Sequence, residues 1–360
     1  MIVFSAVLLV PSLATAQGAP EGDEAEAVTP SGSAPPRLVI KGFGDVNFRL
    51  FREKATNDDT RNSFFLGQID LFLTSQLAER VSVLAELVAK FRTNNDPFYD
   101  VDRIHITYHL SDTANIRLGK MHAALGYWNQ TYHHGAWFQT TAARPEIYLF
   151  NGILPIHLIG IELYGTKALG PVDIDYTVSA GNGRGKTLAD TTNVSDFNNA
   201  KAVNVLASIA PAAIPGFKIG GDLWLDTIPP GDTASRVDSI RERLWGVHAV
   251  YLNGPVELLA EYFEMNHVVK SAARPSYDAQ GAYAQAAYQI ATEWKPYYRF
   301  DYQNVESGNP YLTAPGRLQR HTLGVRWDPF TWNGLKLELS AGRRDGHNER
   351  ALLAQTAFTF

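Results

Sequence analysis

The sequence predicts an all-β protein, a 16-stranded antiparallel transmembrane β-barrel. Polar and apolar residues alternate with a period of two from Leu38 to the C-terminus, which is typical of strands with two different faces. The connecting segments are alternately short and long, as in barrels that cross a membrane. No second run of about 18 apolar residues follows the N-terminal one, so we expect no membrane-spanning helix. With 45% hydrophobic and 19% charged residues, the chain has the composition of a folded protein.

The first 16 residues have the features of a secretory signal peptide. An apolar run over 2–10 is followed by Ala14-Thr15-Ala16, the small-x-small pattern that signal peptidase accepts. The run is shorter than the roughly 20 residues of a transmembrane anchor, so we expect cleavage near Ala16. Since no Lys or Arg precedes the run, we also expect the natural chain to begin further upstream.

Residues 17–36 are expected to form a disordered acidic periplasmic tail before the barrel domain, 37–360. Gly, Pro, Ser, Ala and acidic residues dominate this segment, and such a composition cannot offset the entropy of ordering. Its four acidic residues leave a net charge of −1 for 37–360, which argues against a nucleic-acid partner. The chain has no cysteine, which excludes disulfide scaffolds, thiol nucleophiles and cysteine-ligated metal sites.

The strands follow one another without a helical interruption. We expect them at 38–51, 63–77, 81–91, 101–110, 115–121, 156–165, 172–181, 201–210, 217–226, 242–252, 256–265, 277–291, 296–305, 320–328, 335–344 and 351–360. In the fourth of these, one face reads Ile104, Ile106, Tyr108 and Leu110 and the other Arg103, His105, Thr107 and His109. A soluble sandwich would also alternate, but it would repeat at roughly 8–12 residues, which is closer than here.

Seven short connections separate eight longer, more polar ones. The longer ones are 52–62, 92–100, 122–155, 182–200, 227–241, 266–276, 306–319 and 345–350. This layout predicts tight periplasmic turns and longer external loops, and an even strand count puts both chain ends in the periplasm. Aromatic residues near strand ends, such as Trp245, Trp294 and Trp327, fit interfacial girdles, with ordinary core packing as the alternative.

The C-terminus and the third long loop carry a family resemblance. The chain ends in Ala-Phe-Thr-Phe (357–360), which resembles the closing strand of Gram-negative outer-membrane barrels, and the mature chain as a whole resembles an outer-membrane porin. Three short motifs of this loop are similar to those of phosphate-selective porin-like proteins: LGYWN (125–129), HHG (133–135) and RP (144–145). The resemblance implies an inward-folded third loop that narrows the pore, and a homotrimer; the outward positions Gly42, Gly44 and Ala89 are small enough for close packing.

Inward charges would set the selectivity of such a channel, because a narrow pore focuses their field. Basic and acidic inward residues nearly cancel overall, but basic ones predominate on 296–344 and beside the third loop. The expected pore-lining residues are Arg103, His105, Arg117, His133, His134, Arg144, Glu146, Arg299, Arg320 and Arg326. They predict a weak preference for anions at the constriction. The alternative is that these arginines pair with inward carboxylates and hold the loop to the wall.

We expect no metal site, no cofactor and no catalytic residues. His133, His134 and His122 invite a metal hypothesis, but adjacent extended side chains diverge and the loop has no acid before Glu146, so pore lining or packing is favoured. The GNGRGK segment (181–186) lacks the strand-to-helix context of a phosphate loop. No GxSxG elbow occurs, and no serine is paired with the histidines of 101–110, which argues against an enzyme.

The function that these observations favour is passive diffusion of small hydrophilic solutes or ions through a water-filled outer-membrane channel. Its partners would be those solutes together with outer-membrane lipid and lipopolysaccharide. Two alternatives remain: a substrate-specific channel, for example one selective for phosphate or other anions, and a non-conducting adhesive or structural barrel.

Overall fold

The computed structural model describes residues 37–53, 61–91, 95–133, 135–150, 152–188, 197–231, 238–313 and 316–360. The expected signal peptide (1–16), the expected tail (17–36) and His134 lie outside these residues.

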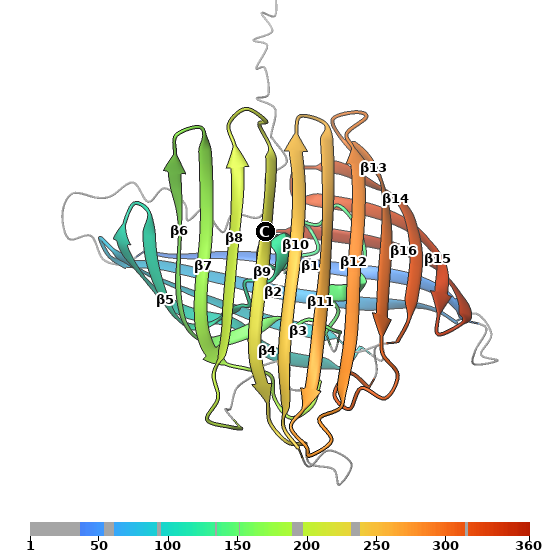
Figure 1. Cartoon of the computed structure of the whole chain (residues 1–360). Helices are drawn as coiled ribbons and strands as arrows, with labels where there is room; N and C mark the ends of the chain where they lie inside the picture. Colours follow the sequence, from blue (N-terminus) through green and yellow to red (C-terminus); the bar gives the residue numbers. More distant parts are fainter. Residues whose placement is uncertain are drawn as a thin grey trace, which may run out of the picture.

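The described chain forms a closed antiparallel barrel of 16 strands, as the sequence predicts (Figure 1). Each strand pairs with its neighbours in the sequence, and β1 pairs with β16 to close the ring. The strands are β1 (Leu38–Glu53), β2 (Arg61–Ala78), β3 (Val81–Phe91), β4 (Pro97–Ser111), β5 (Ala114–His122), β6 (His157–Leu169), β7 (Val172–Asn182), β8 (Ala202–Pro211), β9 (Phe217–Ile228), β10 (Ile240–Asn253), β11 (Val256–Val269), β12 (Ser276–Tyr288), β13 (Trp294–Val305), β14 (Leu318–Phe330), β15 (Asn333–Arg344) and β16 (His347–Thr359).

One expected long connection is wrong. The sequence pattern predicts a longer loop at 345–350, but β16 begins at His347 and only Asp345 and Gly346 separate it from β15. Both residues have positive φ angles, 48° and 84°. A two-residue turn of this kind is the type I′ hairpin that Asp-Gly favours, because its twist matches that of the flanking strands.

The wall of the barrel has its polar face inside and its apolar face outside. On β10, Glu242 and His248 are buried while Trp245 and Val247 are exposed. On β9, Asp222 is buried and its neighbour Leu223 is exposed. A soluble protein buries the opposite set, so this arrangement is that of a barrel with an apolar surround and a polar interior.

The closing strand covers the glycines of β1. The backbone of Phe360 exchanges two hydrogen bonds with Gly42, at 2.8 and 2.9 Å. A Cβ on Gly42 would overlap the Phe360 ring, and one on Gly44 would overlap the Phe358 ring. These two small outward positions therefore hold the terminal aromatic side chains of the same chain, which accounts for their size without a neighbouring subunit.

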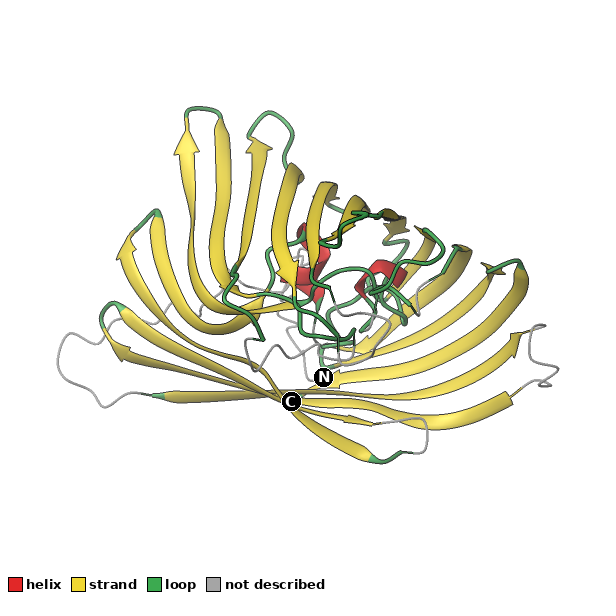
Figure 2. Ribbon diagram, turned by 60° about the horizontal axis from the view of Figure 1, so that its bottom comes forward, coloured by secondary structure: helices red, strands yellow, loops and turns green. Residues whose placement is uncertain are grey.

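The segment 123–156, between β5 and β6, carries the short helices α1 (Gly126–Tyr132) and η1 (Glu146–Tyr148). Helix α1 contacts β9 and β10, and η1 contacts β12 and β13, although all four strands lie far along the chain from β5. Figure 2 draws both helices amid the strands of the barrel. Among the described residues, no helix is long and apolar enough to span a membrane.

Candidate functional site

An apolar cluster anchors the segment 123–156 to the barrel wall. The Trp128 and Tyr148 rings stack with centroids 5.0 Å apart, and Phe263 and Tyr283 of the wall pack edge-on against Tyr148. All four side chains are buried. Trp224, Leu259 and Met265 of the wall belong to the same buried apolar cluster, so burial of these side chains holds the segment against β9–β12.

Carboxylates of β9 and β11 accept the first backbone N–H groups of α1. Asp222 Oδ1 lies 3.0 Å from the Gly126 nitrogen, and Glu261 Oε1 lies 2.8 Å from the Trp128 nitrogen. A Cβ on Gly126, whose φ is 70°, would overlap the Glu261 carboxylate. Glycine is therefore needed where the loop backbone approaches this acid.

Other wall carboxylates accept hydrogen bonds from backbone N–H groups in the middle of the loop. Glu338 Oε2 accepts from the nitrogens of Ala142 at 3.0 Å and Ala143 at 3.2 Å. Asp301 Oδ1 accepts from the Glu146 nitrogen at 2.9 Å. These contacts satisfy backbone donors of an irregular buried segment, which would otherwise be costly.

Three wall cations satisfy loop carbonyls in the same way. Arg299 donates to the oxygens of Ala143 at 2.6 Å and Arg144 at 3.3 Å, and to Thr141 Oγ1 at 2.9 Å. The other two bind further carbonyls of the same loop: Arg326 those of Trp137 and Gln139, and Lys336 those of Ala136 and Thr141. Arg299 is fully buried and also pairs with Asp301 at 2.9 Å.

A group of charges, here called the rim cluster, joins the loop to β14–β16; its arginines reach solvent, whereas both of its carboxylates are buried. Glu146 accepts from Arg320 at 2.8 Å and Arg344 at 2.9 Å, and Glu349 lies 3.5 and 3.1 Å from the same two arginines. Arg49 of β1 is exposed and within electrostatic range of this group. The rim cluster, Arg49, Glu146, Arg320, Arg344 and Glu349, thus holds three guanidinium groups and two carboxylates.

The remaining arginines expected to line the pore are also engaged. Arg103 lies 2.7 Å from Glu86, and Arg117 lies 3.2 Å from Glu162. Arg144, in the loop, packs over Phe150 and donates to the His133 carbonyl oxygen at 3.3 Å. Burial lowers the pKa of Arg144 to about 10, so it remains charged at neutral pH.

The two described histidines of the expected set, His105 and His133, are both buried. His105 lies 3.4 Å from Thr107 Oγ1. His133 follows α1 and packs beside two further histidines, His122 and His157. Taken together, every arginine of the expected set donates to a carboxylate or to a backbone oxygen.

Two backbone irregularities turn residues inward that strict alternation would place outside. Glu86 pairs with Arg103 and Leu87 with Val101, so Asp102 is the extra residue of a β-bulge and is buried next to Arg103. Gly119 has a φ of 140°, and beyond it Lys120 and His122 are buried like Arg117. Sequence reasoning missed Asp102 and Lys120 because a period-two count carries no sign of a bulge or of an unusual glycine φ. It missed His157 because the sequence does not show that this residue lies opposite His122.

The comparisons with known proteins agree with this fold. The family model described as phosphate-selective porin O and P matches residues 231–357. An anion-selective porin from Comamonas acidovorans superimposes with a TM-score of 0.66 at 10% identity, covering 90% of this chain and 100% of that one. The outer-membrane channel DcaP of Acinetobacter baumannii gives 0.60 at 13% identity, covering 91% and 99%.

A trimer form of in-vitro folded OmpT, an outer-membrane protein of Vibrio cholerae, gives a TM-score of 0.60 at 11% identity, covering 91% of this chain and 100% of that one. No protein of curated function matches the chain in sequence. At these identities the structural matches establish the fold, which is the fold of outer-membrane porins.

Proposed function

We propose that the chain is an outer-membrane porin, a water-filled channel for passive diffusion of small hydrophilic solutes and ions. The observation that carries the proposal is the inverted barrel, whose charged residues face the interior and whose apolar residues face outward. Such a wall suits a lipid surround and a hydrated interior. The partial match to the phosphate-selective porin family adds support.

In this proposal the segment 123–156 is the constriction of the pore. Wall carboxylates bind its N–H groups and wall cations bind its carbonyl groups, on strands from β9 to β15. A loop held at so many points has a fixed position, and it sets the free cross-section that a solute meets. Size selection therefore depends on these anchors.

We further propose a weak preference for anions. We assign this preference to the rim cluster and not to the interior as a whole, because three guanidinium groups face two carboxylates in the rim cluster. A single net positive charge near the pore favours anions modestly. The anion-selective porin among the structural matches is consistent with this direction.

The proposal includes the export and the surroundings of the barrel. Residues 1–16 act as the signal peptide, and 17–36 form a periplasmic tail. Arg241 and Arg243 are exposed on the outer face of β10 next to Trp245, which suits contact with the phosphates of lipopolysaccharide. The trimer form among the structural matches supports a homotrimer.

Two measurements on the purified chain test this function. In liposome-swelling assays, sugars of increasing size should enter at decreasing rates, whereas an adhesive or structural barrel would admit none. Under a KCl gradient across a planar bilayer, the reversal potential should have the sign of a modest preference for chloride. A preference for potassium would contradict the anion assignment and leave the channel assignment intact.

A further inference from the structure

The two ends of the segment 123–156 each carry a histidine, and the barrel brings the two together. His122 is the last residue of β5 and His157 is the first residue of β6, and they are directly opposite each other in the register of this antiparallel pair. Opposite residues of antiparallel strands have neighbouring side chains. Their ring centroids are 5.5 Å apart, and both side chains are buried.

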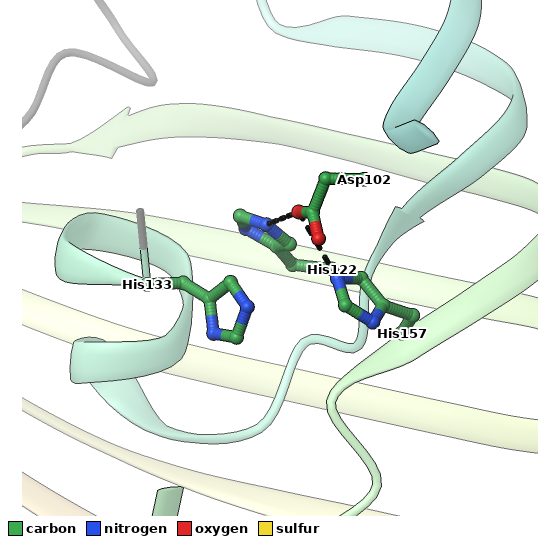
Figure 3. Close-up of side chains that lie close together, drawn as sticks. All are labelled: Asp102, His122, His133 and His157. Atoms are coloured by element: carbon green, nitrogen blue, oxygen red, sulfur yellow. Dashed lines mark hydrogen bonds and ion pairs between the residues drawn. The ribbon is translucent and has the colours of Figure 1, made fainter. Parts of the chain in front are cut away.

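Asp102 joins the two histidines from the adjacent strand β4. Because it is the extra residue of the bulge, its carboxylate turns to the side on which these rings lie. Asp102 Oδ2 is 3.3 Å from Nε2 of His122 and 3.1 Å from Nε2 of His157 (Figure 3).

The fourth member of this cluster is His133, which the loop itself supplies. It directly follows α1, and its ring centroid lies 4.5 Å from that of His122 and 5.2 Å from that of His157. Figure 3 shows its ring directed toward the other three side chains. One potential ligand atom from each of Asp102, His122, His133 and His157 lies within 4.8 Å of the others.

We propose that Asp102, His122, His133 and His157 bind a divalent transition-metal ion of the zinc class. Three imidazole nitrogens and one carboxylate oxygen are a donor set that Zn²⁺ prefers, and four protein ligands make a closed site of structural type. Bonds of about 2.0–2.1 Å at tetrahedral angles place ligand atoms about 3.4 Å apart. The two distances from Asp102 to His122 and His157 already match this spacing.

The remaining separations, up to 4.8 Å, must contract by at most about 1.4 Å. His133 is on the loop rather than on a strand, so the loop end and the imidazole torsions provide this adjustment. Metal binding then draws His133 toward Asp102, His122 and His157, whose backbone positions are fixed by the strand ladder.

Charged side chains of β3, β4 and β5 surround Asp102. Asp102 Oδ1 is 3.6 Å from Lys90 Nζ, and Asp100 pairs with both Lys90 at 3.6 Å and Lys120 at 3.3 Å. Lys90 orients the second carboxylate oxygen and leaves Oδ2 toward the histidines, as outer partners of metal ligands do. The two aspartates offset the two lysines, and Arg144 of the loop is a further cation within electrostatic range of Asp102.

A metal at this position ties β4, both ends of the loop and α1 to one point. It is a structural site that fixes the base of the segment 123–156. This inference does not depend on the porin function, because metal binding is measured on the folded barrel in detergent.

The test is an isothermal calorimetric titration of the EDTA-treated, detergent-folded chain with Zn²⁺. A parallel titration with Co²⁺ is monitored by visible absorption spectroscopy. We expect one Zn²⁺ per chain and the intense visible bands of four-coordinate Co²⁺. His133→Ala and Asp102→Asn should each bind at least about 10- to 100-fold more weakly. His109→Ala is the matched control, because this β4 histidine contacts Ser82 and Asn115 instead of the cluster.

Heat-modifiable migration in gels verifies that each variant is a folded barrel, and His122→Gln replaces any variant that fails this check. The proposal is overturned if the unaltered chain binds no Zn²⁺, if either ligand variant binds as tightly as the unaltered chain, or if the His109→Ala control loses binding equally.

Discussion

Replacing Arg299 with methionine should release the third loop without opening the barrel. Arg299 is fully buried, pairs with Asp301 and donates to three oxygens of the loop. Methionine fills much of the same volume but cannot pair with Asp301. The buried Asp301 carboxylate then keeps only the Glu146 N–H and Arg320, which is 3.8 Å away, among its named partners. Removing one partner of a buried pair costs about 3–5 kcal/mol.

The strand ladder of β13 with β12 and β14 is untouched, so closure of the barrel should persist. The assay is denaturant unfolding followed by tryptophan fluorescence, since Trp128 and Trp137 lie in the loop. We expect a loop transition at lower denaturant and, in single channels, larger and noisier conductance. Arg343→Met, at an exposed position of β15, is the control and should change stability by no more than about 0.5 kcal/mol. Identical loop transitions and conductance in the two variants would refute the anchoring role.

Two further substitutions test the charge and membrane assignments. Glu146→Gln removes the loop carboxylate shared by Arg320 and Arg344. In water, loss of one negative charge about 8 Å away favours an anion and disfavours a cation by about 0.5 kcal/mol each, so the anion-to-cation permeability ratio should rise about fivefold. An unchanged or lower ratio in reversal-potential measurements would contradict the rim cluster's role. Leu339→Arg, at an exposed mid-strand position of β15, should lower the free energy of unfolding in lipid bilayers by about 2–4 kcal/mol. Leu169→Arg, at the exposed end of β6, should lower it by only about 0–1 kcal/mol. Equal costs at the two positions would argue against a lipid-facing wall.

The strands could be predicted because their two faces meet different surroundings. In β9, for instance, Asp222 and Asp226 alternate with Leu223 and Leu225, and the barrel buries the two acids and exposes the two leucines. The short hairpin at Asp345-Gly346 could also be predicted from the sequence, since this dipeptide strongly favours a type I′ turn.

The site was harder to predict because its contacts depend on backbone irregularities and on distant pairings. A bulge turns Asp102 inward, and the unusual φ of Gly119 does the same for Lys120 and His122. The partners of the loop are mainly its backbone groups, and nothing in the sequence says which wall side chain reaches which amide. Arg299 was predicted to line the pore, but its role in binding the loop, like that of Glu338, follows only from the fold.

Single-channel conductance in a planar lipid bilayer tests the central claim, that this barrel is an open, loop-narrowed pore. We expect discrete, ohmic conductance steps from the purified, heat-modifiable chain, and larger steps from Arg299→Met. A correctly folded barrel that inserts into the bilayer and conducts no ions would contradict it and would favour a non-conducting adhesive or structural role.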